Sequence, residues 1–179
     1  MCDDRLKLIQ SELIKSGMDA LFVKSGVNVL AMLGYWPCNH SAAGLIPAEG
    51  EPVLFVPETE YGDALLSIGD DPMTLRTYPL ESTEVLRDSV DGMLPVLTRE
   101  VDAMGLSSGK IGLEMSFEDG SVGRMVGDFK YPSNPTWDRL AKAMPKVGFI
   151  DASGTISKLR MVKTPREIDR VRSAIAAAI

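Results

Sequence analysis

RLKLIQSELIKSGMDALFV (residues 5–23) decides the fold class, because two different periodicities follow one another within it. Apolar residues recur at the three- and four-residue spacing of a helix, which predicts a helix over residues 4–16 that ends at Gly17. The next five residues, DALFV (19–23), form a short apolar run between turn signals, as a buried strand does. A helix followed directly by a buried strand indicates an α/β domain.

The alternation of helix and strand continues downstream. Two brief apolar runs flank the polar turn AEGE and predict an antiparallel hairpin over residues 44–57. Pro95 removes a backbone donor from a long helical pattern and is expected to kink or divide that helix. Residues 116–135 are rich in Gly, Ser, Asp and Pro and are interpreted mostly as a loop. Further helices are predicted over residues 58–68, 83–104 and 136–144, and further strands over residues 73–78, 110–115 and 147–151.

Length and composition describe one soluble globular domain, with 179 residues, 45% of them apolar and 25% charged. A net charge of -6 argues against binding nucleic acid by phosphate neutralisation. The apolar runs are too short to span a bilayer, and the start MCDDR is not a signal peptide. Cys2 and Cys38 have no CxxC spacing, which suits a reducing compartment. The sequence therefore predicts a cytoplasmic protein without a nucleic-acid or membrane partner.

The segment TPRE (164–167) has the pattern of a helix start. In such a capping box the Thr164 side chain accepts from the third helical amide, while Glu167 reaches back to the cap. Pro165 occupies the first helical position, where its missing N–H costs nothing. The apolar stripe that follows reaches Ile179 without Gly, Asn or Pro, which favours a helix that continues beyond this chain. The alternative is a natural terminal helix that packs on its own domain.

Four stretches of the chain carry a resemblance to a known family. ISKLRMVKTPREI (156–168) is similar to the junction pattern "i..LR.iKsp.Ei", and residues 5–23 are similar to the opening "R...l...l...g.Dallv". IGLE (111–114) is similar to the strand "iGvE", and NVLAMLGY (28–35) is similar to "N..YltGf" with two departures. Together they resemble the creatinase/prolidase amino-terminal domain of peptidase family M24, which precedes the catalytic domain in Xaa-Pro aminopeptidases, prolidases and creatinases.

The resemblance implies a fold, a domain division and a set of partners. The fold is a mixed β-sheet flanked by helices, of the ribonuclease-H-like type. Residues 1–158 correspond to the amino-terminal domain, and residues 159–179 to the junction and the start of a helix that leads into an absent catalytic domain. Arg160, Lys163 and Glu167 are assigned to this junction. The implied partners are the catalytic domain of the same protein, a second copy in a homodimer and a peptide substrate.

The resemblance also implies a metallopeptidase that hydrolyses Xaa-Pro bonds with two divalent ions (Mn, Co or Zn), all held by the absent domain. The residues agree with this division, since the chain has one His, no HExxH-like cluster and no glycine-rich phosphate loop. The sequence therefore predicts no catalytic residue and no metal ligand here, and no activity for this chain alone.

The loop YWPCNH (35–40) is the candidate contact site, because it combines aromatic and polar residues directly after an apolar run. In dimers of the family, the corresponding loop reaches the active site of the neighbouring subunit. The resemblance thus makes Trp36 and His40 candidates for contacting substrate. The alternative is that Trp36 covers the edge of the core and His40 is an ordinary surface or capping residue.

Three functions remain open at this point. The first is the non-catalytic domain of an Xaa-Pro peptidase, which contributes to the substrate cleft and to dimer contacts. The second is a peptide- or protein-binding module of a catalytically inactive homologue, and the third is a complete small α/β binding domain. Within the first, a creatinase-type amidinohydrolase is an alternative, because a fold does not determine a function. The sequence favours the peptidase domain.

Overall fold

The computed structural model describes residues 3–38, 42–79, 89–115, 118–119, 130–131 and 135–178. Its helices are α1 (Asp3–Lys15), α2 (Gly26–Leu33), α3 (Tyr61–Ile68), α4 (Ser89–Ala103), α5 (Pro135–Ala143), α6 (Ser153–Met161) and α7 (Pro165–Ala178), with a short 3-10 turn η1 (Glu58–Glu60) before α3. Its strands are β1 (Ala20–Val23), β2 (Ala43–Pro47), β3 (Val53–Pro57), β4 (Thr74–Tyr78), β5 (Lys110–Leu113), β6 (Glu118–Asp119), β7 (Lys130–Tyr131) and β8 (Gly148–Asp151).

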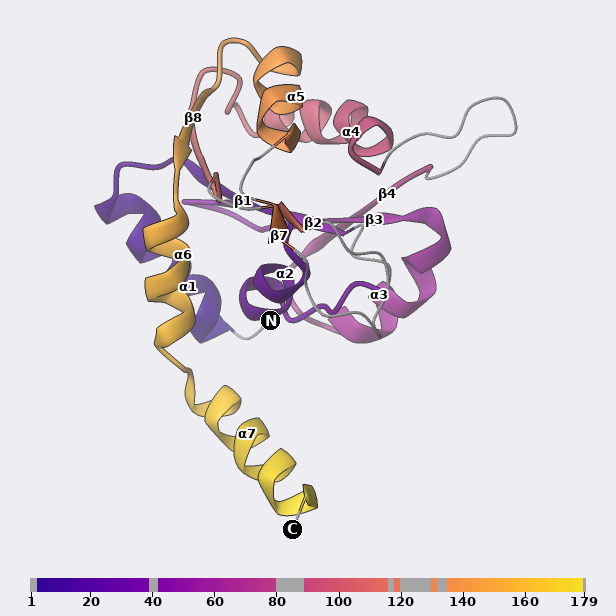
Figure 1. Ribbon diagram of the computed structural model, residues 1–179, viewed down its shortest axis with the longest axis vertical. Coiled ribbons are helices and arrows are strands. Elements are labelled where there is room, and N and C mark those ends of the chain that lie inside the picture. The colour runs from indigo at the N-terminus through magenta and orange to yellow at the C-terminus, as the bar shows by residue number, and fades with distance from the viewer. Residues whose placement is uncertain are drawn as a thin grey trace.

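The centre of the molecule is a six-stranded mixed sheet in the order β4-β3-β2-β1-β5-β8. Strand β2 pairs antiparallel with β1 and β3, whereas the pairs β3/β4, β1/β5 and β5/β8 are parallel. Helices α4 and α5 cover one face of the sheet, and α1, α2, α3 and α6 lie on the other (Figure 1). The predicted hairpin, the α/β class and the mixed sheet flanked by helices are confirmed.

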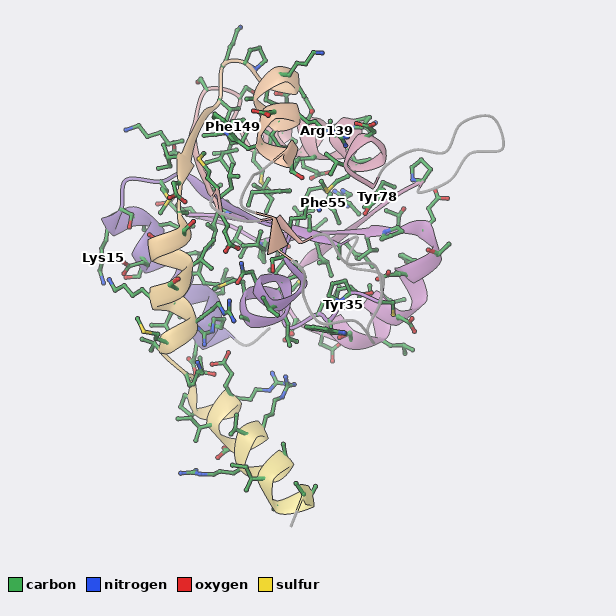
Figure 2. The ribbon with its side chains drawn as sticks, viewed as in Figure 1. Lys15, Tyr35, Phe55, Tyr78, Arg139 and Phe149 are labelled. Carbon is green, nitrogen blue, oxygen red and sulfur yellow. The ribbon has the colours of Figure 1, made fainter. Side chains whose placement is uncertain are left out.

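Because both faces of the sheet are covered, the protein has two apolar cores. Leu21 and Val23 of β1 belong to the core beneath α1, α2, α3 and α6. Their neighbours Ala20 and Phe22 belong to the core beneath α4 and α5. In Figure 2, Phe55 and Tyr78 lie toward α4 and Tyr35 lies on the opposite side of the sheet. A strand buried on both faces reads as a continuous apolar run, which explains why DALFV identified β1.

Two helices of the structure, α2 and α6, were not among the sequence predictions. Helix α2 spans only eight residues, five of which are buried, and it ends at Gly34 with φ 77°. A short run that is apolar nearly all round has no helical periodicity to detect. Helix α6 opens with Ser, Gly and Thr, which are weak helix formers, and the sequence analysis had assigned its end to the junction.

The structure differs from two sequence predictions, in α4 and in the segment that follows β5. Helix α4 continues through Pro95 and is not divided there. Met93 and Leu97, on either side of the proline, are both buried in the core beneath α4, which holds the helix together. The predicted start of this helix, residues 83–88, lies outside the described residues. Within the predicted loop, β6 and β7 form a short antiparallel pair, and the rest of residues 116–134 is not described.

The chain after β8 leaves the body of the molecule. Helix α7 begins at Pro165, as predicted, and projects away from the sheet and its helices (Figure 1). The predicted domain boundary at residues 158 and 159 falls within α6, and the division itself stays a prediction. No helix in the described part of the chain is long and apolar enough to cross a bilayer.

Candidate functional site

The turn between α6 and α7 brings the predicted junction residues together. Helix α6 is held firmly against the domain, because Ile156 and Leu159 are buried in the core shared with α1. Lys158 adds an ion pair to Glu12 of α1, with 2.6 Å between Nζ and Oε1. The turn that follows α6 therefore starts from a fixed point.

The start of α7 carries the predicted capping box. The Thr164 amide donates to Glu167 Oε2 at 2.7 Å, and the Glu167 amide donates to Thr164 Oγ1 at 3.3 Å. Thr164 is only 2% exposed, so the residue that caps α7 is itself buried in the domain. The capping box is confirmed, and it places the Glu167 carboxylate at the amino-terminal end of α7, where the helix dipole stabilises it.

Arg5 of α1 reaches the same turn. Its Nη1 donates to the Leu159 carbonyl oxygen at 2.7 Å, and its Nη2 donates to the Val162 carbonyl oxygen at 2.8 Å. Its Nε donates to Glu167 Oε1 at 3.2 Å, and Nη2 also pairs with the second Glu167 oxygen. Arg5 is 4% exposed. One buried guanidinium thus contacts α6, the turn and α7 at once.

The ionisation of Glu167 reflects these contacts. Burial disfavours the charged carboxylate, but hydrogen bonds from Arg5 and Thr164 and the Arg5 charge outweigh burial, so the pKa of Glu167 lies below its ordinary value of 4.5. A carboxyl whose folded pKa is lowered contributes stability above its unfolded pKa, and that contribution is lost as pH falls through the folded pKa. Acid therefore weakens the link between α1 and α7.

We expect the amide proton of Thr164, which donates to the Glu167 carboxylate, to report this titration by NMR. As pH is lowered from neutrality, its chemical shift should change with a midpoint below 4.5. Replacing Arg5 by glutamine should move the midpoint upward, because the neighbouring positive charge is lost. A midpoint at or above 4.5 in the unchanged protein would contradict the lowered pKa.

Arg160 and Lys163 make further contacts at this turn. Nη1 of Arg160 donates to Asn28 Oδ1 at 3.2 Å, and Nδ2 of Asn28 donates to Glu114 Oε2 at 2.6 Å. Nζ of Lys163 donates to the Arg160 carbonyl oxygen. Arg160 is therefore tied to α2 and, through Asn28, to the residue after β5. The role of Arg160, Lys163 and Glu167 in contacting another domain stays a prediction.

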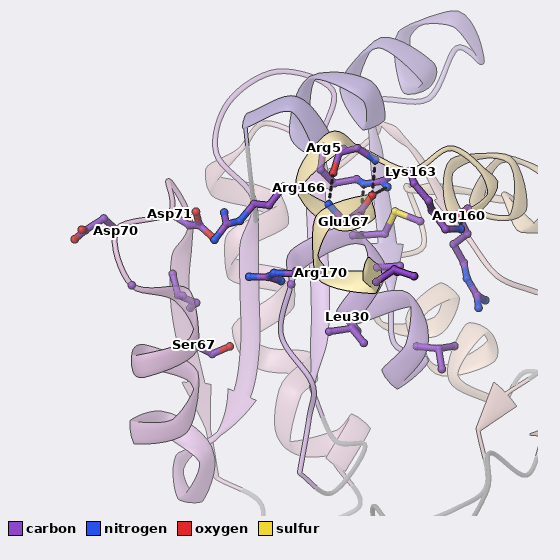
Figure 3. A pocket seen from close by; sticks show the side chains of 18 residues that line it. Arg5, Leu30, Ser67, Asp70, Asp71, Arg160, Lys163, Arg166, Glu167 and Arg170 are labelled. Carbon is purple, nitrogen blue, oxygen red and sulfur yellow. Dashed lines mark hydrogen bonds and ion pairs between the residues drawn. The ribbon is translucent and has the colours of Figure 1, made fainter. Parts of the chain in front are cut away.

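A groove of about 930 Å³ opens beside this turn (Figure 3). Helix α7 contributes Arg166, Arg170 and Val171, helix α2 contributes Leu30, and residues 67–71 close the opposite side. In Figure 3 the two arginines of α7 lie over the groove, with Asp70 and Asp71 across from them. The groove combines apolar surface with charged side chains, as protein contact surfaces do.

The predicted contact loop is anchored by a buried carboxylate. Glu60 of η1 is 2% exposed, and its Oε2 accepts from the Tyr35 hydroxyl at 2.6 Å and from the Cys38 amide at 3.1 Å. Burial, the Glu60 hydrogen bond and nearby negative charge raise the pKa of Tyr35 well above its ordinary value, so the hydroxyl stays a donor. Both ends of the segment 35–38 are therefore held, with the half-buried Trp36 between them.

The structure describes Trp36 but not His40, which lies outside the described residues. Their roles as substrate contacts accordingly stay predictions. Sequence reasoning missed Arg5, Asn28 and Glu60 as site residues. Arg5 and Asn28 stand in stretches that carry the family resemblance, which was the available signal, whereas Glu60 is one acidic residue among several in an acidic turn.

Within the described residues, no three His, Cys, Asp or Glu side chains lie together so that they could hold a metal ion. The geometry there offers binding and orientation: a clamped helix start, a groove with charged sides and a loop held by Glu60.

The sequence is similar to that of a hydrolase. The chain is 26% identical over 172 residues to an ectoine hydrolase from Halomonas elongata, an alignment that covers 95% of this chain and 40% of that protein. The chain thus spans about 40% of the length of this relative.

Solved structures share the fold. The N-terminal domain of the cytoplasmic peptidase PepQ from Mycobacterium tuberculosis superposes with a TM-score of 0.59 at 20% identity, covering 88% of this chain and 99% of that one. The Xaa-Pro dipeptidase from Bacillus anthracis gives a TM-score of 0.62 at 15% identity, covering 93% of this chain and 38% of that one. At these identities the likeness shows the fold alone.

The family assignment comes from a family model. The model of the creatinase/prolidase N-terminal domain matches residues 5–162, which include β1–β8 and extend from Arg5 to Val162, the first residue after α6. The chain belongs to the creatinase/prolidase N-terminal domain family, the amino-terminal domain of M24 peptidase-like proteins.

Proposed function

We propose that this chain is the non-catalytic amino-terminal domain of a cytoplasmic, metal-dependent hydrolase of Xaa-Pro peptides. In this proposal it shapes the substrate cleft and contributes to a homodimer, while a catalytic domain that follows α7 holds two divalent ions (Mn, Co or Zn) and hydrolyses the peptide. The family assignment supports this, as does the fold shared with peptidases whose names include an Xaa-Pro dipeptidase.

The observation that carries the proposal is the exposed apolar face of α7. Ile168, Val171 and Ile175 are 39%, 52% and 56% exposed, and they recur at helical spacing. An apolar stripe of this kind favours contact with another protein surface, because its burial there would be stabilising. A following catalytic domain of the same protein is the partner that we propose, with Arg160, Lys163 and Glu167 at the junction.

Trp36 and His40 are proposed to contact the peptide bound by the other subunit of the dimer. The support is the placement of Trp36 on a segment that Glu60 holds at both ends. A loop fixed in this way presents a side chain with little loss of conformational entropy on binding.

A second candidate is ring opening of ectoine or hydrolysis of a related amidine. The match to the ectoine hydrolase, which covers 95% of this chain, favours it. The two candidates share the same division of labour between domains and differ in the substrate that the catalytic domain accepts.

The test compares this chain with the protein extended through its native reading frame. Both are incubated with added manganese and either Xaa-Pro peptides or ectoine, and the released amino acid or opened ring is quantified, with chelator as the control. We expect peptide hydrolysis by the longer form, loss of that activity with chelator, and none by this chain.

Other outcomes separate the candidates. Opening of ectoine without peptide hydrolysis would establish the second candidate. If neither form acts on either substrate and the downstream region lacks Asp, His and Glu ligands, the enzyme reading is wrong and a peptide- or protein-binding module replaces it.

A further inference from the structure

Packing does not set the direction in which α7 leaves the domain. None of the 14 described residues of α7 is buried, and the helix projects from the body (Figure 1). Helix α6, in contrast, is fixed by Ile156 and Leu159 in the core and by the ion pair of Lys158 with Glu12. The link between a fixed helix and an unpacked one is the turn at Val162 and Lys163.

The contacts that cross this turn converge on Arg5. Its guanidinium donates to the carbonyl oxygens of Leu159 in α6 and Val162 in the turn. It also pairs with the Glu167 carboxylate in the first turn of α7 (Figure 3). Glu167 is itself held by Thr164, so its carboxylate cannot move without the start of α7. Arg5 is 4% exposed and rooted in α1, which makes it a rigid reference point.

The chemistry of these groups explains why an arginine stands here. The last carbonyls of a helix and a carboxylate at the start of the next helix both attract a cation, because each lies at the negative end of a dipole or carries a negative charge. The guanidinium offers five donors in a fixed planar fork and can therefore address all three acceptors at once. A lysine ammonium at the same depth is a single point of contact and cannot span them.

We propose that Arg5 is a positioning residue that fixes the direction of α7 relative to the sheet, by joining the carbonyls of the α6–α7 turn to Glu167. Without it, α7 turns about Val162 and Lys163 into a range of directions. If the proposed function holds, Arg5 also sets how the following catalytic domain faces this one; that consequence rests on the proposed function, whereas the direction of α7 does not.

The test measures the distance between two spin labels on this chain by pulsed electron paramagnetic resonance spectroscopy. One label is placed on α7 at Ser173→Cys and the other in the turn between β2 and β3 at Glu49→Cys, both exposed positions, with Cys2 and Cys38 replaced by serine. In this doubly labelled protein with Arg5 unchanged, the parent, we expect one narrow distance distribution. Adding Arg5→Met should give a broad distribution, and adding Arg5→Lys one of intermediate width.

Arg76→Met is the matched control, because Arg76 also pairs with a largely buried carboxylate, Glu100, but between β4 and α4. It should leave the distribution narrow. A folded Arg5→Met variant with the narrow distribution of the parent would overturn the proposal. If Arg5→Met does not fold, the Glu167→Ala variant provides the test. The Glu167 side chain is 31% exposed, and its removal breaks the ion pair with Arg5 from the α7 side. A narrow distribution in Glu167→Ala would then overturn the proposal, and a broad one would support it.

Discussion

Replacing Gly112 by valine should destabilise the protein by about 1–3 kcal/mol or more, the usual cost of overpacking a close-packed core. Gly112 is buried in the middle of β5, between β1 and β8. A Cβ added there would lie 2.4 Å from Met18 Sδ and 2.9 Å from Ala152 Cβ, and valine adds two further methyl groups. Both neighbours are themselves buried, so relief requires moving the start of α6 away from the sheet.

Gly148 supplies the matched control, because it lies in the neighbouring edge strand β8 and is exposed. A Cβ at Gly148 would meet nothing closer than 3.7 Å, and valine favours strands, so Gly148→Val should be close to neutral. Urea denaturation followed by circular dichroism compares the two variants. Equal stabilities of the two variants would show that the contact at Gly112 does not constrain the fold. Gly112 is the glycine of the stretch IGLE, and its close contacts with Met18 and Ala152 explain why that stretch needs a residue without a side chain here.

Replacing Glu60 by alanine should destabilise the protein by about 1–3 kcal/mol, because one buried and one part-buried donor lose their acceptor. The donors are the Tyr35 hydroxyl and the Cys38 amide, which share one carboxylate oxygen. Since they hold both ends of the segment around Trp36, the loss should also loosen that segment. Chemical denaturation measures the first effect. Fluorescence of Trp36, with Trp137 replaced by phenylalanine, measures the second as a red shift of the emission.

Glu58 is the control within the same 3-10 turn, because it is exposed. Glu58→Ala should change the free energy of unfolding by less than about 0.5 kcal/mol and leave the emission in place. Tyr35→Phe combined with Glu60→Ala should be less destabilising than the sum of the two single changes, since both remove the same hydrogen bond. Additive effects, or an unshifted Trp36 emission in Glu60→Ala, would show that Glu60 does not anchor the loop.

Most elements of the fold could be predicted because their signals are local. The helix and strand in residues 5–23, the hairpin and the start of α7 each depend on residues that are neighbours in the sequence. The capping box is the clearest case, because Thr164 and Glu167 are three residues apart and their hydrogen bonds form as soon as the helix does. The two unpredicted helices, α2 and α6, lack that local signal, since one is apolar on nearly every side and the other opens with weak helix formers.

In the candidate site, too, only features that depend on neighbouring residues in the sequence could be predicted. The family resemblance of residues 156–168 assigned Arg160, Lys163 and Glu167 to the junction, and the structure gathers them around the α6–α7 turn. Arg5 and Glu167 are 162 positions apart, so no spacing rule could pair them, and the pairing of Glu60 with Tyr35 across 25 positions was equally hidden. The sequence therefore indicated the junction segment and the capping box within it, but not the distant side chains that meet that segment.

The sequence by itself determined the α/β class, the order of most elements and the start of α7, because hydrophobic periodicity and helix capping act over a few residues. Only the tertiary structure decided that Arg5 joins three elements at the α6–α7 turn, that Gly112 leaves room for Met18 and Ala152, and that Glu60 anchors the loop around Trp36. These contacts form when the sheet brings distant segments together, and their energies depend on burial and on exact distances, neither of which is written in any single stretch of the chain.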